Sequence, residues 1–369
     1  MDPDTLPLGG TPGVRHELLV RRYGTPGARP KVYVQAGLHA GELPGVLTAH
    51  HLCALLDGAE VVGEVVVLPL ANPLGLQQRV LGGGVGRFSL ADGANYNRGY
   101  PQLWHAAGDA LAGDEAALGA DGAANAQRVR AALRDAAAAL PAVTPEDHLR
   151  RALLRQAVDA DWVLDLHCDG QALMHLYTLT RHADAAQPLA RLLGAAAVLV
   201  AEDSGGNPFD EACSRPWPEL ARRFPGHPLG PGCVAVTVEL RGAADVDHAL
   251  AAADARALLG ALTHMGAVAG PAPALPPALC APTPLAAVEA LAAPVAGVIA
   301  YHRQPGDRVE AGDTVLDLVD PATGAVTPVR AAAAGLLFAR RAVRYAAAGD
   351  RLGKIAGTEP RRTGLLLSP

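Results

Sequence analysis

Val32-Tyr-Val-Gln-Ala-Gly-Leu-His39-Ala-Gly-Glu42 is the stretch of sequence that decides the fold. Its first half is rich in β-branched and aromatic residues, which predicts a buried strand. The glycines that follow predict a turn, and apolar residues spaced for one buried face predict a helix over residues 42–56. The stretch therefore predicts the strand–turn–helix unit of an α/β fold.

The predicted turn carries an imidazole and a carboxylate, His39 and Glu42. In the first turn of a helix, residues i and i+3 lie on the same face, so these two side chains can converge on one metal ion. Open α/β sheets also bind their ligands where a strand ends and a helix begins. A catalytic zinc takes three protein ligands and leaves a position open for water, so a third ligand is expected elsewhere.

The strand Val163-Leu-Asp165-Leu-His167 supplies the candidate for the third ligand. His167 ends a predicted buried strand and can point toward the cleft that holds His39 and Glu42. Asp165 lies two residues earlier on the same face, where it can fix the tautomer of a metal-binding imidazole. Each histidine alone would more often be a core or surface residue, but the combination favours a metal site.

Predicted strands and helices alternate along the first 265 residues, which indicates an α/β domain with a largely parallel or mixed sheet. The predicted strands cover residues 13–23, 31–37, 64–70, 162–167, 173–180, 196–202 and 234–240. The predicted helical segments cover residues 42–56, 105–160, 185–195 and 245–265, with Thr144 as a cap before Pro145. Residues 203–232 are rich in proline and glycine and are predicted to be a long functional loop.

In the C-terminal part of the chain, the sequence predicts short strands and turns instead of alternating strands and helices. We expect a catalytic domain over residues 1–268, a Pro/Ala-rich linker over 269–284 and a small all-β domain over 285–369. Short motifs recur within this last part, which indicates a half-repeat that resembles the barrel-sandwich domain of biotinyl and lipoyl carriers. Those carriers attach their group to a lysine in the central hairpin, whereas the hairpin Asp320-Pro-Ala-Thr-Gly324 has none. A structural or oligomeric role is therefore expected.

Composition excludes several classes of function. The 369 residues are 50% hydrophobic and 18% charged, which predicts a sizeable core, and the net charge of -6 with 4% aromatics disfavours nucleic-acid binding. No secretory signal and no membrane span is apparent. The five cysteines are scattered, without the spacing of a disulfide framework or a zinc knuckle. We expect a soluble cytoplasmic protein that does not act at membranes.

Five short motifs occur in an order that resembles the succinylglutamate desuccinylase/aspartoacylase family, a branch of the zinc carboxypeptidase superfamily. The motifs are His39-x-x-Glu42, Asn72-Pro73, Asn97-Arg98, Asp165-Leu-His167 and Thr237-Val-Glu239-Leu-x-Gly242. The resemblance covers about residues 30–245. It implies a zinc-carboxypeptidase-like domain, with a central mixed sheet flanked by helices, and a C-terminal β-domain. It also implies one zinc ion per chain, held by His39, Glu42 and His167.

The resemblance implies roles for four further residues. Glu239 would be the general base that takes a proton from the attacking water and then hands it to the leaving amine. Glu239 lies on an otherwise apolar strand, where an idle charge would be costly, although a glutamate paired with an arginine is the alternative. Arg98 with Asn97 would clamp a substrate carboxylate. Arg87 would polarise the scissile carbonyl or hold the substrate's acid group.

The sequence departs from the family pattern at three places. Two residues before Asn97 the family usually has aspartate, and this chain has Asn95. Arg241 adds a cation beside the Glu239 motif. The segments 105–150 and 203–232 differ in length from the small enzymes of the family, so the substrate cannot be named from the resemblance.

The sequence thus predicts a zinc-dependent hydrolase that cleaves the amide of an N-acyl amino acid or a related small carboxylate-bearing compound. A metallocarboxypeptidase that acts on peptides is the first alternative, because the same clamp can hold a C-terminal carboxylate. A non-catalytic, metal-stabilised binding protein is the second. The ligand set also accommodates cobalt or manganese. Homo-oligomer formation stays open.

Overall fold

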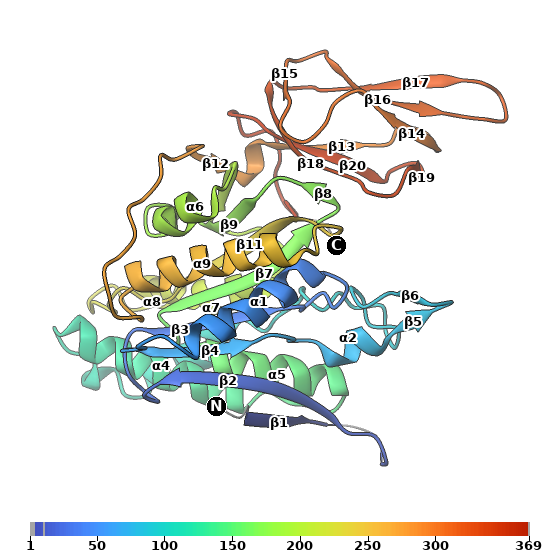
Figure 1. Cartoon of the computed structure of the whole chain (residues 1–369). Coiled ribbons are helices and arrows are strands. Elements are labelled where there is room, and N and C mark those ends of the chain that lie inside the picture. Colours follow the sequence, from blue (N-terminus) through green and yellow to red (C-terminus); the bar gives the residue numbers. More distant parts are fainter. Residues whose placement is uncertain (1–3, 10–11, 368–369) are drawn as a thin grey trace.

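A nine-stranded mixed sheet forms the centre of the protein (Figure 1). The computed structural model describes residues 4–9 and 12–367. The strand order is β1-β2-β4-β3-β7-β11-β9-β10-β12, in which β4, β3, β7 and β11 run parallel and β2 and β9 run antiparallel to their inner neighbours. The strands are β1 (Asp4–Leu8), β2 (His16–Gly24), β3 (Lys31–Ala36), β4 (Glu64–Leu68), β7 (Trp162–Asp169), β9 (His175–Leu179), β10 (Ala197–Ala201), β11 (Val234–Gly242) and β12 (Pro282–Pro284).

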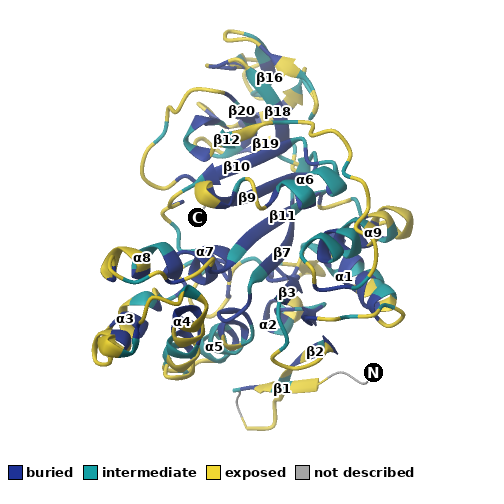
Figure 2. Ribbon diagram, turned by 90° about the vertical axis from the view of Figure 1, so that its left-hand side faces the viewer, coloured by how far each residue is buried: buried dark blue, intermediate teal, exposed yellow. Residues whose placement is uncertain are grey.

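Helices cover both faces of this sheet (Figure 2). Helices α1 (Leu43–Leu56), α6 (Gln187–Leu193) and α9 (His248–His264) pack on one face. The other face is covered by α3 (Trp104–Ala112), α4 (Gly122–Ala138), α5 (Pro145–Ala157), α7 (Phe209–Ser214) and α8 (Pro216–Arg223). The remaining short elements are α2 (Pro73–Gln77), the hairpin β5 (Arg79–Val80) and β6 (Gly83–Gly84), and the 3-10 turns η1 (Glu115–Ala117), η2 (Thr180–His182) and η3 (Leu285–Ala287). The predicted mixed α/β architecture is confirmed.

The register of the central strands gathers polar side chains on one face. Gln35 on β3 pairs with Asp165 on β7, and His167 on β7 pairs with Glu239 on β11. Because side chains alternate along a strand, these residues share a face, while neighbours such as Leu166 pack under α1 and α9. The site can therefore be polar without disturbing the apolar core beneath it.

Residues 203–232 contain more structure than the sequence predicted. Helices α7 and α8 lie within this segment, and the buried side chains of Phe209 and Trp217 anchor them to the core. Prolines here begin helices, because Pro208 precedes α7 and Pro216 opens α8, where a missing N–H costs nothing. The proline- and glycine-rich composition therefore led to the prediction of a loop where two short helices occur. The predicted start of α5 is confirmed, with Thr144 in a capping box.

Beyond η3, all regular elements are strands, and we call residues 288–356 the C-terminal β-region. Its strands are β13 (Val288–Ala292), β14 (Gly297–Tyr301), β15 (Arg308–Val309), β16 (Thr314–Val319), β17 (Val326–Arg330), β18 (Gly335–Arg340), β19 (Tyr345–Ala346) and β20 (Arg351–Ala356). They form two sheets around their own apolar cluster. The hairpin without a lysine is the turn between β16 and β17, as predicted.

The C-terminal β-region is joined to the central part by strand pairing. The short strand β8 (Gln171–Ala172), just after β7, pairs antiparallel with β18. A shared apolar cluster that includes Leu199, Leu285 and Phe338 lies at this junction. The β-region therefore sits over the carboxyl end of β7, at the top of Figure 1. Within the described residues, no helix is long and apolar enough to cross a membrane.

Candidate metal centre and active site

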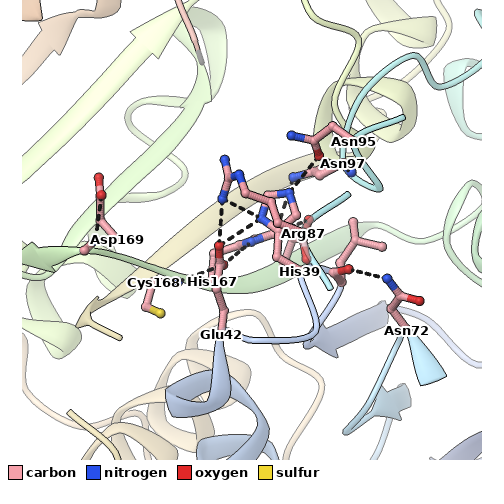
Figure 3. A network of polar contacts seen from close by, with 12 residues as sticks. His39, Glu42, Asn72, Arg87, Asn95, Asn97, His167, Cys168 and Asp169 are labelled. Atoms are coloured by element: carbon pink, nitrogen blue, oxygen red, sulfur yellow. Dashed lines mark hydrogen bonds and ion pairs between the residues drawn. The ribbon is translucent and has the colours of Figure 1, made fainter. Parts of the chain in front are cut away.

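The loop between β3 and α1 is held in a fixed shape by its neighbours. Gly37 takes a left-handed conformation, with φ of 69°, which glycine adopts without steric cost. The Asn72 amide donates to the Leu38 carbonyl at 2.9 Å, and the Ala40 amide donates to the Gly86 carbonyl at 3.1 Å. Asn72, which the sequence offered only as part of the Asn72-Pro73 motif, thus braces the loop that carries His39 (Figure 3).

His39, Glu42 and His167 meet at one point (Figure 3). One carboxylate oxygen of Glu42 lies 2.9 Å from Nδ1 of His39, and the other lies 2.8 Å from Nδ1 of His167. Potential ligand atoms of the three residues all lie within 4.8 Å of one another. The predicted trio is therefore together, although His167 is 125 residues from Glu42 along the chain.

The outer nitrogens of both imidazoles face oxygen atoms. Nε2 of His39 lies 2.8 Å from Oδ1 of Asn95, and Nε2 of His167 lies 3.0 Å from Oδ2 of Asp165. Gln35 donates to the other oxygen of Asp165 at 2.9 Å. With the protons on Nε2, each Nδ1 offers its lone pair toward Glu42. Two imidazole nitrogens and a carboxylate fit a divalent ion such as zinc.

The charges of this cluster oppose the cost of burial. Burial alone would raise the pKa of Glu42, but the charges and hydrogen bonds of His39 and His167 hold it well below its usual range. Burial lowers the pKa of His39, whereas the charges of Asp165 and Glu42 outweigh burial and hold the pKa of His167 well above its usual range. Glu42 also accepts a hydrogen bond from Arg87 at 3.0 Å. A metal ion binds neutral imidazoles and an ionised carboxylate, so metal binding would displace the proton that these charges favour on His167.

Glu239 lies on β11 beside His167 in a different environment. It is partly exposed to a cavity, yet its Oε2 atom is enclosed and has no hydrogen-bond partner among the described residues. Burial, reinforced by the charge of Glu42, raises the pKa of Glu239 to about 7. The alternative of a glutamate paired with an arginine is not observed among the described ion pairs, since Arg241 bonds Asp254 instead. A carboxylate with this pKa can exchange a proton near neutral pH.

The predicted substrate-binding residues surround the same cavity. Arg87 points at the cluster, 3.2 Å from Nδ1 of His39. Asn97 is buried, with its oxygen accepting from the Phe209 amide at 2.8 Å and its nitrogen 3.3 Å from Nε2 of His167. Arg98 donates to the Asn97 carbonyl at 2.6 Å. Helix α7, hidden in the sequence, thus positions Asn97.

A cavity of about 430 Å³ brings all these groups together. It is lined by His39, Glu42, Arg87, Asn97, Arg98, His167 and Glu239, and also by Ser204, Pro208, Asp210 and Glu211 around α7. The C-terminal β-region adds a further wall, which includes Arg340, Arg341 and Lys354. Asp165 lies beneath the cavity, behind His167.

Sequence reasoning missed Gln35, Tyr177 and Lys354 as members of this site. Gln35 has a local signal, because it is a polar residue in an otherwise apolar strand. Lys354 has a compositional signal, because the chain holds only two lysines. Tyr177 has no local signal, and its position depends on the pairing of β9 with β11.

Comparisons with known proteins agree with this arrangement. Residues 28–265 match the model of the succinylglutamate desuccinylase/aspartoacylase catalytic domain. A crystal structure of a succinylglutamate desuccinylase/aspartoacylase family protein from Shewanella amazonensis SB2B is 28% identical, with a TM-score of 0.84, over 96% of this chain and 98% of that one. A similar protein from Shewanella frigidimarina NCIMB 400 is 26% identical, with a TM-score of 0.82 and 96% of both chains covered.

More distant structures share the fold alone. The product-bound ectoine utilization protein EutE (DoeB) from Ruegeria pomeroyi is 17% identical, with a TM-score of 0.66 over 97% of this chain and 96% of that one. No curated protein matches the sequence. The match of the catalytic-domain model covers well over half of the chain. The chain therefore belongs to the succinylglutamate desuccinylase/aspartoacylase family.

Proposed function

We propose that this protein is a zinc-dependent hydrolase that cleaves the amide bond of an N-acyl amino acid or a related small carboxylate-bearing amide. The observation that carries the proposal is the enclosed Oε2 of Glu239, which has no hydrogen-bond partner among the described residues, beside the cluster of His39, Glu42 and His167. A protein that only bound a metal would need the cluster but would have no use for a buried, unpaired acid. This contrast favours an enzyme over a metal-stabilised binding protein.

In the proposed mechanism, His39, Glu42 and His167 hold one zinc ion per chain. Bound zinc supplies a Lewis acid that polarises the amide carbonyl and lowers the pKa of water. Glu239 accepts the proton of the attacking water and then donates it to the leaving nitrogen. In the metal-free protein, burial and the charge of Glu42 raise the pKa of Glu239, which favours its taking up a proton.

The polar residues of the cavity wall orient the substrate. Arg87, which already reaches Glu42, is placed to stabilise negative charge that develops on the carbonyl oxygen. Arg98 and Asn97 are assigned to the substrate carboxylate, because guanidinium groups bind carboxylates bidentately. Asp165, supported by Gln35, orients His167.

The walls of the cavity favour small substrates over peptides. Residues around α7 close one side, and the C-terminal β-region closes another. A peptide substrate of a carboxypeptidase would need an open groove on the acyl side of the scissile bond, where its chain continues. A metallocarboxypeptidase therefore remains the second candidate, supported only by the shared carboxylate clamp.

We further propose that residues 1–268 act as the catalytic domain and residues 285–369 as a second domain, with 269–284 as the linker. The separate apolar cluster of the C-terminal β-region supports this division.

Metal analysis of the purified protein, paired with a hydrolysis screen, tests the proposal. The screen covers N-acetyl-, N-succinyl- and longer N-acyl-amino acids, and also dipeptides with a free C-terminal carboxylate. Each compound is tested with and without a chelator. We expect one zinc per chain and release of free amine that the chelator abolishes. Cleavage confined to dipeptides would replace the proposal with the peptidase, and a protein that binds no divalent metal would overturn it.

A further inference from the structure

Lys354 of the C-terminal β-region lines the cavity that holds His39, Glu42, His167 and Glu239. It extends from β20, and its ammonium group lies 2.6 Å from Oδ2 of Asp169 at the end of β7. The same group donates to the hydroxyl of Tyr177 on β9 at 3.3 Å. Lys354, Asp169 and Tyr177 all line the cavity. The contact therefore brings a residue from outside the region matched by the catalytic-domain model to the wall beside Glu239.

Two hydrogen-bond donors in this contact have no acceptor among the described residues. An ammonium group has three N–H donors, and Lys354 uses one on Asp169 and one on Tyr177. The Tyr177 hydroxyl accepts from Lys354, so its own hydrogen is left to donate. Both donors line the cavity, so their acceptors must come from water or from a bound ligand. Since both residues face the cavity, an oxygen atom of a ligand is the natural acceptor.

The charges around these donors favour an uncharged oxygen. Asp169 already compensates Lys354, and Glu239 is a further acid close enough to influence the pKa of Lys354. Four arginines of this side also line the cavity, but no described hydrogen bond or ion pair joins one of them to either donor. Arg341 pairs with Asp350, and Arg340, Arg351 and Arg362 bond neutral oxygens of Gln171, Leu367 and Leu366. A second carboxylate would add negative charge beside two acids, whereas an amide or hydroxyl oxygen would not.

The position beside Glu239 indicates which half of the substrate is held there. Under the proposed function, on which this step rests, Glu239 hands a proton to the leaving nitrogen. The amino-acid half must then lie next to Glu239. Tyr177 pairs with Thr237 across the β9–β11 ladder, two residues from Glu239 and on the same face.

We propose that Lys354 and Tyr177 form a subsite that binds an uncharged side-chain oxygen, an amide or a hydroxyl, in the amino-acid half of the substrate. The C-terminal β-region thereby helps to select the substrate.

Three matched substrates test the subsite: N-acetyl-L-glutamine, N-acetyl-L-glutamate and N-acetyl-L-norvaline. They carry an uncharged oxygen, a charged oxygen and no oxygen on side chains of similar length. We expect kcat/KM for the glutamine compound to exceed each of the others by about tenfold or more, the effect of one to two hydrogen bonds. Tyr177→Phe and Lys354→Met should bring the glutamine and norvaline compounds to within about threefold, mainly through KM.

Lys31→Met is the matched control. Lys31 is the only other lysine and forms a buried pair with Asp159 at 2.5 Å, away from the cavity. Its loss should affect thermal stability as Lys354→Met does but leave the ratio between substrates unchanged. If Lys354→Met fails to fold, Tyr177→Phe still tests the subsite, because it removes one hydroxyl and keeps the ion pair.

A binding measurement separates this inference from the proposed function. Calorimetric titration of the zinc-loaded protein with L-glutamine, L-glutamate and L-norvaline requires no hydrolysis. Tighter binding of L-glutamine that Tyr177→Phe removes would support the subsite even if no amide were cleaved. If N-acyl amino acids are cleaved but the three side chains are equivalent, or glutamate is preferred, the subsite is wrong and the hydrolase stands. Equal or absent binding of all three amino acids likewise overturns it.

Discussion

Glu42 and Glu239 are two glutamates of one cavity, and their surroundings shift their pKa values in opposite directions. Glu42 contacts two imidazoles and Arg87, and these partners hold its pKa well below the usual range despite burial. Glu239 has no such partner for Oε2, and burial raises its pKa to about 7. The same side chain is therefore prepared as an anionic ligand in one place and as a proton carrier in the other.

This difference arises from the contacts that each residue makes at its position in the fold. Glu42 follows a turn that aims it at His39 and at the end of β7, whereas Glu239 extends from β11 with no described residue in hydrogen-bond contact with its Oε2. The comparison shows that the role of an acidic residue in this site is set by its neighbours. Five predictions test it.

Replacement of Glu42 by glutamine should have the largest effect. The amide cannot supply the anionic ligand, so we expect loss of bound metal and a fall in kcat/KM of more than about a thousandfold. Metal content by elemental analysis and amide hydrolysis are the measurements. Full metal occupancy in this variant would show that Glu42 is not a ligand.

Replacement of Glu239 by glutamine should separate metal binding from turnover. We expect normal metal content and a kcat lowered by about 10²–10⁴-fold, because the proton carrier is gone. Glu64→Gln, which alters another buried glutamate outside the cavity, is the control. Retention of full hydrolysis by Glu239→Gln would rule out the assignment of this residue as the base.

The two glutamates should also give the metal-free protein opposite pH dependences of stability. A raised pKa means that the folded state binds more protons than the unfolded state between about pH 4.5 and 7, so Glu239 makes folding less favourable as pH rises through this window. Glu42, with a lowered pKa, instead loses its stabilising contribution as pH falls below about 4.5. Relative to the wild type, Glu239→Gln should gain about 1–3 kcal/mol of unfolding free energy between pH 4.5 and 8.

Denaturant unfolding of both proteins in chelator at several pH values measures this gain. A constant difference across the range would contradict the raised pKa of Glu239.

Replacement of Arg98 by alanine should weaken substrate binding without removing the metal. Loss of a charged, bidentate contact is worth about 1.5–3 kcal/mol, or about 10–100-fold in kcat/KM for substrates with a carboxylate. Arg223→Ala, which removes an exposed pair with Asp109, serves as the control. Equal kinetics of Arg98→Ala and the wild type on the acid and on its methyl ester would eliminate the clamp.

Replacement of Asn95 by aspartate should have the smallest effect. Asn95 faces Nε2 of His39, and a carboxylate there would make the imidazole a stronger ligand. We expect tighter metal binding by up to about tenfold, measured by competition with a chelator. Weaker binding would mean that the amide is required in this position.

The parts of the molecule that were predictable are those with a local pattern. The strand–turn–helix around His39, the strand that carries His167 and the short strands after residue 288 all follow from alternation and turn residues. Glu239 was a candidate through the family resemblance and its apolar strand. The contacts of Asn72 with Leu38 and of Lys354 with Asp169 could not be predicted, because they depend on the packing of distant segments. Helices α7 and α8 were missed because their prolines resemble those of a loop.

The pairing of β8 with β18 joins two segments of the chain that each supply a different part of the cavity wall. Residues up to about 265 carry the cluster and Glu239, while the wall with Lys354 is encoded after residue 284. Recombination within the intervening segment could exchange one recognition wall for another while the catalytic groups stayed intact. An incoming region would have to satisfy a two-residue strand edge, the hydrogen bonds to Gln171, the apolar junction and the carboxylate of Asp169.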